Sequence, residues 1–138
     1  MVRRSITELC VADHQNDATT LAEWLANKNP EVFVKWLASP NNFCLVAEEN
    51  DHLLGVGMLL RNGYVSLLYL LPGVQRRGIG KAIYLGMEQQ AKHWGLRKLT
   101  TESTASACAF YERMGFKSTG DAVLGFGRAR CWPYEKAL

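Results

Sequence analysis

Long hydrophobic runs, paired metal ligands and blocks of like charge are all missing from this sequence. Its four cysteines form no CxxC pair and do not cluster with its three histidines, which argues against a zinc or thioredoxin-type site. No apolar run approaches the roughly 20 residues that span a bilayer, and no leader-like apolar stretch follows Arg3-Arg4. We therefore predict a cytoplasmic protein with free thiols, no metal and no membrane contact.

The composition predicts one folded domain over residues 1–138. Hydrophobic residues make up 48% of the chain and charged residues 21%, which is typical of a globular protein with a real core. The net charge of +3 mildly favours anionic ligands but is too small to indicate a nucleic-acid partner.

The first half of the chain changes from helical to strand periodicity. Residues 5–27 predict one bent helix or two short ones, with Asp17 as a cap, and Pro30 begins a further helix. Residues 43–49, 53–60 and 64–71 predict an antiparallel meander, with a hairpin turn at Asn62-Gly63.

The second half alternates helix and strand. Residues 82–94 and 104–114 have helical spacing, and residues 98–102, 116–119 and 122–132 are strand candidates. A right-handed crossover makes strands 65–71 and 98–102 parallel neighbours. The predicted fold class is α/β (α+β), with a mixed, mostly antiparallel sheet and helices on both faces.

The segment Gln75-Arg76-Arg77-Gly78-Ile79-Gly80-Lys81 carries the most information about function. It joins an apolar strand to the helix at 82–94, and free amides at a helix start bind anions. The Walker pattern fails because Ile79 follows Gly78 where lysine is required, and the dinucleotide pattern fails because residue 83 is Ile.

Two blocks of the chain resemble the GCN5-related N-acetyltransferase family. The first is Gln75-Arg76-Arg77-Gly78-Ile79-Gly80, and the second, Ala107 to Phe116, is similar to the family's A-x-x-F-Y-E-x-x-G-F. Weaker similarity covers Val46-Ala47-Glu48 and Leu54-Gly55-Val56-Gly57. The two main blocks in this order make the resemblance specific.

The resemblance implies that acetyl-CoA is the acetyl donor. Its pyrophosphate would meet the amides of residues 77–81, where two glycines remove the Cβ obstruction, and its pantetheine arm would lie along Leu70 and Leu71. Thr104 stands where the family often has Asn. The residues expected at this ligand are Leu70, Leu71, Gln75, Arg76, Arg77, Gly78, Ile79, Gly80, Lys81 and Thr104.

The resemblance implies fewer catalytic residues than residues that bind acetyl-CoA. Tyr111 occupies the position of the tyrosine that often protonates the leaving sulfur, and a main-chain N–H near Leu70 is expected to polarise the carbonyl. Glu102 is the first candidate for a general base. Glu48, His52, a water-relayed base and direct attack by the neutral amine remain open.

The acceptor is expected to be a primary amine on a small molecule or a protein terminus. Selectivity should come from the first helices, the loop near 36–42 and the closing hairpin, with Trp24, Trp36, Arg128 and Arg130 as candidates. The sequence predicts no strand before the first helix, so the family's first strand is expected to be absent, very short or supplied by a partner, and a homodimer is one expectation. The alternative function is a regulatory module that binds acetyl-CoA without turnover.

Overall fold

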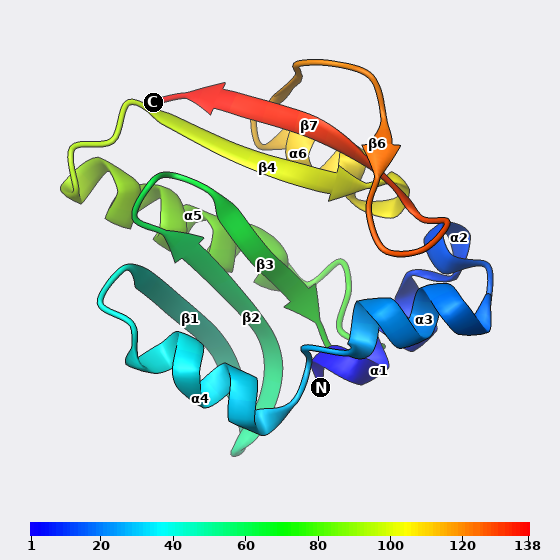
Figure 1. The fold of residues 1–138 in the computed structure, drawn as a ribbon. Helices are drawn as coiled ribbons and strands as arrows, with labels where there is room; N and C mark the ends of the chain where they lie inside the picture. Colours follow the sequence, from blue (N-terminus) through cyan, green and yellow to red (C-terminus); the bar gives the residue numbers. More distant parts are fainter.

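The computed structural model describes residues 1–138 as two small sheets with helices on both faces (Figure 1). The first sheet has the order β1-β2-β3 and the second has the order β4-β7-β5, with β6 paired to β7. The predicted mixed, mostly antiparallel α/β architecture is confirmed.

The N-terminal region forms three short helices before α4. They are α1 (Val2–Leu9), α2 (Val11–His14) and α3 (Ala18–Leu25). The prediction of one bent helix or two short ones is wrong, because the helical path breaks twice: at Cys10, with φ of −102° and ψ of 25°, and at Gln15 and Asn16, which both take positive φ. Asp17 caps α3 as predicted, since its carboxylate accepts from Thr20 N at 3.0 Å. No strand precedes α1.

The first sheet is the predicted antiparallel meander. Its strands are β1 (Asn42–Glu49), β2 (His52–Leu60) and β3 (Val65–Leu70), and α4 (Pro30–Ala38) precedes them. Met58 pairs with Leu67 but Leu59 pairs with Val65, so Ser66 falls outside the register as a bulge. This bulge was not predicted.

The second sheet is longer at its C-terminal end than predicted. After α5 (Ile79–His93), the chain forms β4 (Lys98–Thr104), a 3-10 turn (Ala105–Ala107), α6 (Cys108–Arg113), β5 (Lys117–Ser118), β6 (Val123–Leu124) and β7 (Arg130–Ala137). The prediction of strands at 116–119 and 122–132 is therefore corrected: the last strand starts later and continues through Pro133.

Pro133 is tolerated inside β7 because of the direction in which its missing N–H would point. Pro133 O accepts from Thr119 N at 2.9 Å, on the β5 side of the strand. The N–H of a strand residue points the same way as its carbonyl, and regular pairing with β5 is limited to Lys117 and Ser118. The proline therefore removes no hydrogen bond from the β4 ladder.

The two sheets meet only at the start of β3. Tyr64 and Thr100 form a parallel bridge, and the Thr101 hydroxyl donates to Val65 O at 2.9 Å. Beyond this point β3 and β4 diverge (Figure 1). The predicted parallel relation between β3 and β4 is confirmed. Because their pairing stops after this bridge, the facing edges of the two strands stay unpaired.

The core has a cluster on each side of the first sheet. One cluster joins β2 and β3 to α5, α6 and β7, and the other joins α1 and Trp24 of α3 to Val56 of β2. Gly57 allows α5 to approach closely, because a Cβ there would lie 2.9 Å from the Met87 methyl carbon. None of the helices has both the length and the apolar character needed to cross a membrane.

Candidate active site

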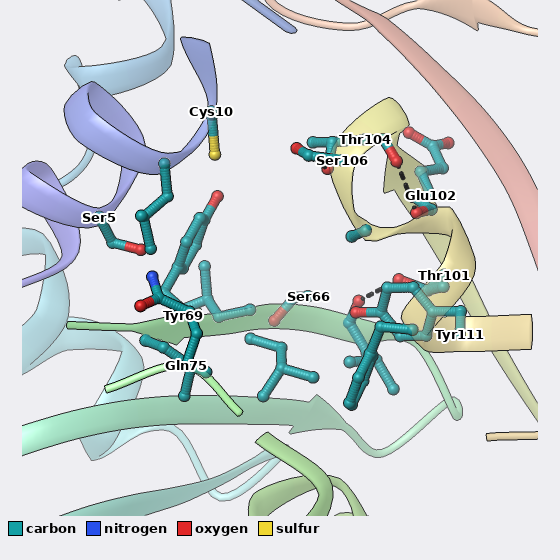
Figure 2. Close-up of a pocket in the computed structure, with 18 of the residues that line it drawn as sticks. Ser5, Cys10, Ser66, Tyr69, Gln75, Thr101, Glu102, Thr104, Ser106 and Tyr111 are labelled. Atoms are coloured by element: carbon teal, nitrogen blue, oxygen red, sulfur yellow. Dashed lines mark hydrogen bonds between the residues drawn. The ribbon is translucent and has the colours of Figure 1, made fainter. Parts of the chain in front are cut away.

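A cavity of about 480 Å³ lies where β3 and β4 diverge (Figure 2). Its walls come from α1, the first sheet, the glycine turn, β4 and α6. In the close-up, Tyr69 and Tyr111 lie on opposite sides with Ser66 between them. The lining includes Ser5, Cys10, Ser66, Leu67, Leu68, Tyr69, Leu70, Gln75, Arg76, Thr101, Glu102, Thr104, Ser106, Phe110, Tyr111 and Arg113.

One edge of β3 faces this cavity without a strand partner. Leu71 N donates to Leu54 O at 2.8 Å, so Leu71 faces β2. Successive residues of a strand alternate in the direction of their amides, which leaves the Leu70 amide facing the cavity. Of the two leucines expected at the ligand, only Leu70 lines the cavity.

The glycine turn ends in a helix start with free amides. Gly78 has φ of +80° and precedes α5, whose first hydrogen bond runs from Ala82 N to Gly78 O at 3.0 Å. The amides of residues 79–81 therefore lack intrahelical partners. A Cβ added at Gly78 would meet no atom within 4 Å, so the space above the turn is open.

Only some side chains of this turn line the cavity. Gln75 and Arg76 line the cavity, and the Gln75 side-chain oxygen accepts from Gly73 N at 2.9 Å. Arg77 instead pairs with Glu49 at 2.8 Å, and Lys81 is exposed outside the cavity lining.

Tyr111 is buried in the cavity wall. Burial raises the pKa of its phenol to about 12, partly offset by the Thr101 hydroxyl. Tyr111 therefore keeps its proton at neutral pH and can donate a hydrogen bond. Cys10, across the cavity between α1 and α2, provides a comparison, since burial raises the pKa of its thiol to about 12 as well.

A second cavity of about 640 Å³ adjoins the first. Ser66, Leu67 and Tyr69 of β3 line both cavities. So do Glu102 and Thr104 of β4. The other lining residues are Trp24, Asn27, Lys28, Trp36, Asn42, Met58, Leu60, Tyr64, Gly125, Phe126, Ala129 and Cys131.

Glu102 lies at the junction of the two cavities. Its carboxylate is near enough to raise the pKa of the Tyr64 phenol and the Cys131 thiol, secondary in both to burial. The other base candidates, Glu48 and His52, are at the far end of the β1–β2 hairpin and line neither cavity.

Only part of the expected acceptor set lines the second cavity. Trp24 and Trp36 do, whereas Arg128 and Arg130 line a separate, smaller cavity with Asp13. The closing hairpin contributes instead through Phe126, which stacks on Trp24 at 5.7 Å between ring centroids.

Several cavity residues carry no signal in the sequence. Ser66 can be assigned to the cavity only once the register shift in β3 is known. Tyr69 can be assigned only from the contact of its hydroxyl, which accepts a hydrogen bond from Trp24 Nε1 at 3.1 Å across 45 residues of sequence. Ser106 is joined to Asp13 of α2, which fixes the turn after β4 against the N-terminal helices.

Splayed parallel strands, with a glycine-led helix start beside them, define an acyltransferase of the acetyltransferase type. Residues 10–138 match the model of the acetyltransferase (GNAT) domain, so the chain belongs to this family. An uncharacterized N-acetyltransferase of Mycobacterium tuberculosis is 28% identical over 109 residues, which cover 74% of this chain and 70% of that protein.

Two further proteins are informative. The peptidyl-lysine N-acetyltransferase YiaC of Escherichia coli is 31% identical over 87 residues, which cover 63% of this chain and 57% of YiaC. The crystal structure of the PaiA N-acetyltransferase of Thermoplasma acidophilum, in complex with coenzyme A, superposes with a TM-score of 0.78 at 19% identity. It covers 99% of this chain and 88% of that one, which shows the shared fold.

Proposed function

We propose that this protein transfers an acetyl group from acetyl-CoA to a primary amine by direct attack. The observation that carries the proposal is the unpaired edge of β3, which leads from Leu70 to the free amides at the start of α5. A chain-like amide ligand ending in a pyrophosphate fits this arrangement, because it can pair with a strand edge and then meet a helix N-terminus.

The donor would be held by main-chain groups more than by side chains. Gly78 leaves room for phosphate oxygens over the amides of residues 79–81, whereas Gly80 is buried and its α-carbon faces Phe110 and Leu70. Gln75 and Arg76 line the same cavity, and Lys81 and Arg77 are the further cations for the 3′-phosphate. When bound, acetyl-CoA supplies an activated acyl group, and the Leu70 amide is the candidate to polarise its carbonyl.

Tyr111 is proposed to protonate the leaving sulfur. The thiol of a free cysteine has a pKa of about 8.5, well below that of a phenol near 12. Burial acts on both groups, however, and the thiol of Cys10 in the same cavity also has its pKa raised to about 12. Burial in this cavity likewise disfavours a departing thiolate, so the difference in pKa between the leaving sulfur and Tyr111 is smaller than the free value suggests.

Glu102 is proposed to receive the amine at the junction of the cavities. A carboxylate there attracts the ammonium form of the acceptor and accepts its proton directly or through water. We expect Glu102→Gln to lower kcat/KM about 100-fold, measured as thiol release over a range of pH. Glu135→Gln is the control, since Glu135 lies on β7, pairs with Lys98 and lines neither cavity.

The proposed function is tested by calorimetry with acetyl-CoA and by a thiol-release assay over an amine panel. We expect binding together with thiol release that some amines accelerate. Binding without acceleration by any amine, including a lysine-containing peptide of the kind that YiaC's name implies, would favour the regulatory module instead. Absence of binding would contradict both functions.

A further inference from the structure

The second cavity contains a buried cation without a counter-ion. Lys28 lies in the connection between α3 and α4 and is only 4% exposed. None of the ion pairs in the structure includes it. Lysine is almost never buried this far unless it is paired, because a desolvated ammonium is costly. The burial of an unpaired ammonium at Lys28 is therefore not explained by folding stability.

The partners of the Lys28 ammonium are all neutral and all line the cavity. It donates to the side-chain oxygen of Asn27 at 2.6 Å and to Trp24 O at 3.4 Å, and it lies 5.2 Å from the centre of the Phe126 ring. Burial alone accounts for the lowering of its pKa to about 8, with no carboxylate opposing it. Two of its three N–H donors make hydrogen bonds, and the third has only the Phe126 ring nearby.

We propose that Lys28 binds a carboxylate of the acceptor, so that the substrate is a small amine with an anionic group at its other end. This inference rests on the proposed acetyl transfer and names the substrate class for it. The second cavity would then have two charged positions of opposite sign, Lys28 for the carboxylate and Glu102 for the amine. Zwitterionic amines match both, and plain alkylamines match only one.

The geometry also explains why a small molecule fits better than a protein side chain. Lys28 lies in the wall of a cavity of about 640 Å³, lined by Trp24, Trp36 and Phe126. This volume is in the range of small-molecule sites. A lysine within a peptide carries no carboxylate to bring to Lys28, so it would leave the buried cation unpaired.

The test is a comparison of matched acceptors on the complete protein. The series runs from glycine to 6-aminohexanoate, with each amino acid assayed beside its own primary amide. We expect at least one acid to be preferred over its amide about 10- to 100-fold in kcat/KM, the effect of one charge-assisted hydrogen bond. Lys28→Met should remove most of this preference and leave the amide rates within a few-fold.

Three results would overturn the inference. One is equal turnover of acids and amides by the unaltered protein. Another is an equal loss of kcat on both by Lys28→Met, which would make Lys28 a base. The third is a clear preference for the peptide lysine. If Lys28→Met fails to fold, as judged by circular dichroism, the acid-to-amide ratio of the unaltered protein still decides. If no amine is turned over, the proposed function fails instead, which is a separate outcome.

Discussion

The two cavities of this protein share a wall but are built in opposite ways. The cavity between β3 and β4 presents the free main-chain edge at Leu70, and the turn that lines it at Gln75 and Arg76 leads to the open amides after Gly78. The adjoining cavity presents side chains, among them Trp24, Lys28 and Glu102. A main-chain site recognises one ligand shape through strand and helix geometry, whereas a side-chain site changes its specificity with each substitution. The difference explains how one scaffold keeps its donor while its acceptor varies.

The comparison becomes sharpest at Tyr111, the proposed proton donor to the leaving sulfur. We expect Tyr111→Phe to lower kcat about 100-fold or more with little change in the KM of acetyl-CoA, because the variant loses the proton for the leaving sulfur but no binding group. Steady-state thiol release measures both constants.

The matched control is Tyr84→Phe, which also removes a buried phenolic hydroxyl. Tyr84 donates to Glu88 at 2.7 Å on α5 and lines neither cavity. We expect it to cost some stability and no catalytic rate. Comparable losses of kcat in both variants would contradict the proton-donor assignment and indicate a packing effect.

The donor side was largely predictable from sequence because its determinants are local. The Asn62-Gly63 turn, the apolar strand and the glycine-led helix start lie within about twenty residues, and their spacing excluded other phosphate sites. The Ser66 bulge was missed, since an outward Ser in a strand looks the same with or without a register shift. The strand predicted over residues 122–132 stopped short of Pro133, although the side on which Pro133 pairs lets β7 continue through it.

The acceptor side could not be predicted because its residues are brought together only by tertiary contacts. Lys28 resembles any surface lysine in sequence, and its burial depends on Trp24 and Phe126, which lie about a hundred residues apart. Arg128 and Arg130 were the predicted ligands for an acceptor carboxylate, but they line the smaller cavity instead.

A smaller effect is expected from the main chain of the donor side. Gly78 and Gly95 lie at opposite ends of α5 with φ of +80° and +77°, and a Cβ at either meets no atom within 4 Å. Replacing either by Ala should therefore cost a similar amount of stability, about 1 kcal/mol, from the left-handed backbone. Only Gly78→Ala should raise the KM of acetyl-CoA, about tenfold, because only its methyl group would lie at the proposed pyrophosphate position.

Thermal unfolding and acetyl-CoA titration of the two variants separate these effects. An equal change of KM in both would mean that the helix start does not hold the donor, and that general loosening of α5 explains the loss. An unchanged KM in both would contradict the proposed phosphate position directly.

The smallest effect concerns stability on the acceptor side, where Lys28 is expected to favour binding at a cost to folding. Replacing a buried, unpaired charge with an apolar chain of similar length is often stabilising. We expect Lys28→Met to raise Tm at pH 7 by roughly 3 to 8 °C, equivalent to about 1 to 2 kcal/mol. A Lys35→Met variant is the control, since Lys35 is an exposed residue of α4 and should leave Tm nearly unchanged.

The gain from Lys28→Met should depend on pH with a definite sign. Burial lowers the pKa of Lys28 to about 8 in the folded protein, from 10.5 when it is free. Below pH 8 both states are charged, so the full cost of the buried charge is present. Between pH 8 and 10.5 the unfolded chain binds the extra proton, and the unaltered protein gains stability relative to the variant as pH rises. The Tm difference should therefore shrink across this range. A Tm difference that stays constant across this range would mean that Lys28 is neutral or paired at pH 7. It would then contradict the proposal that Lys28 binds a substrate carboxylate.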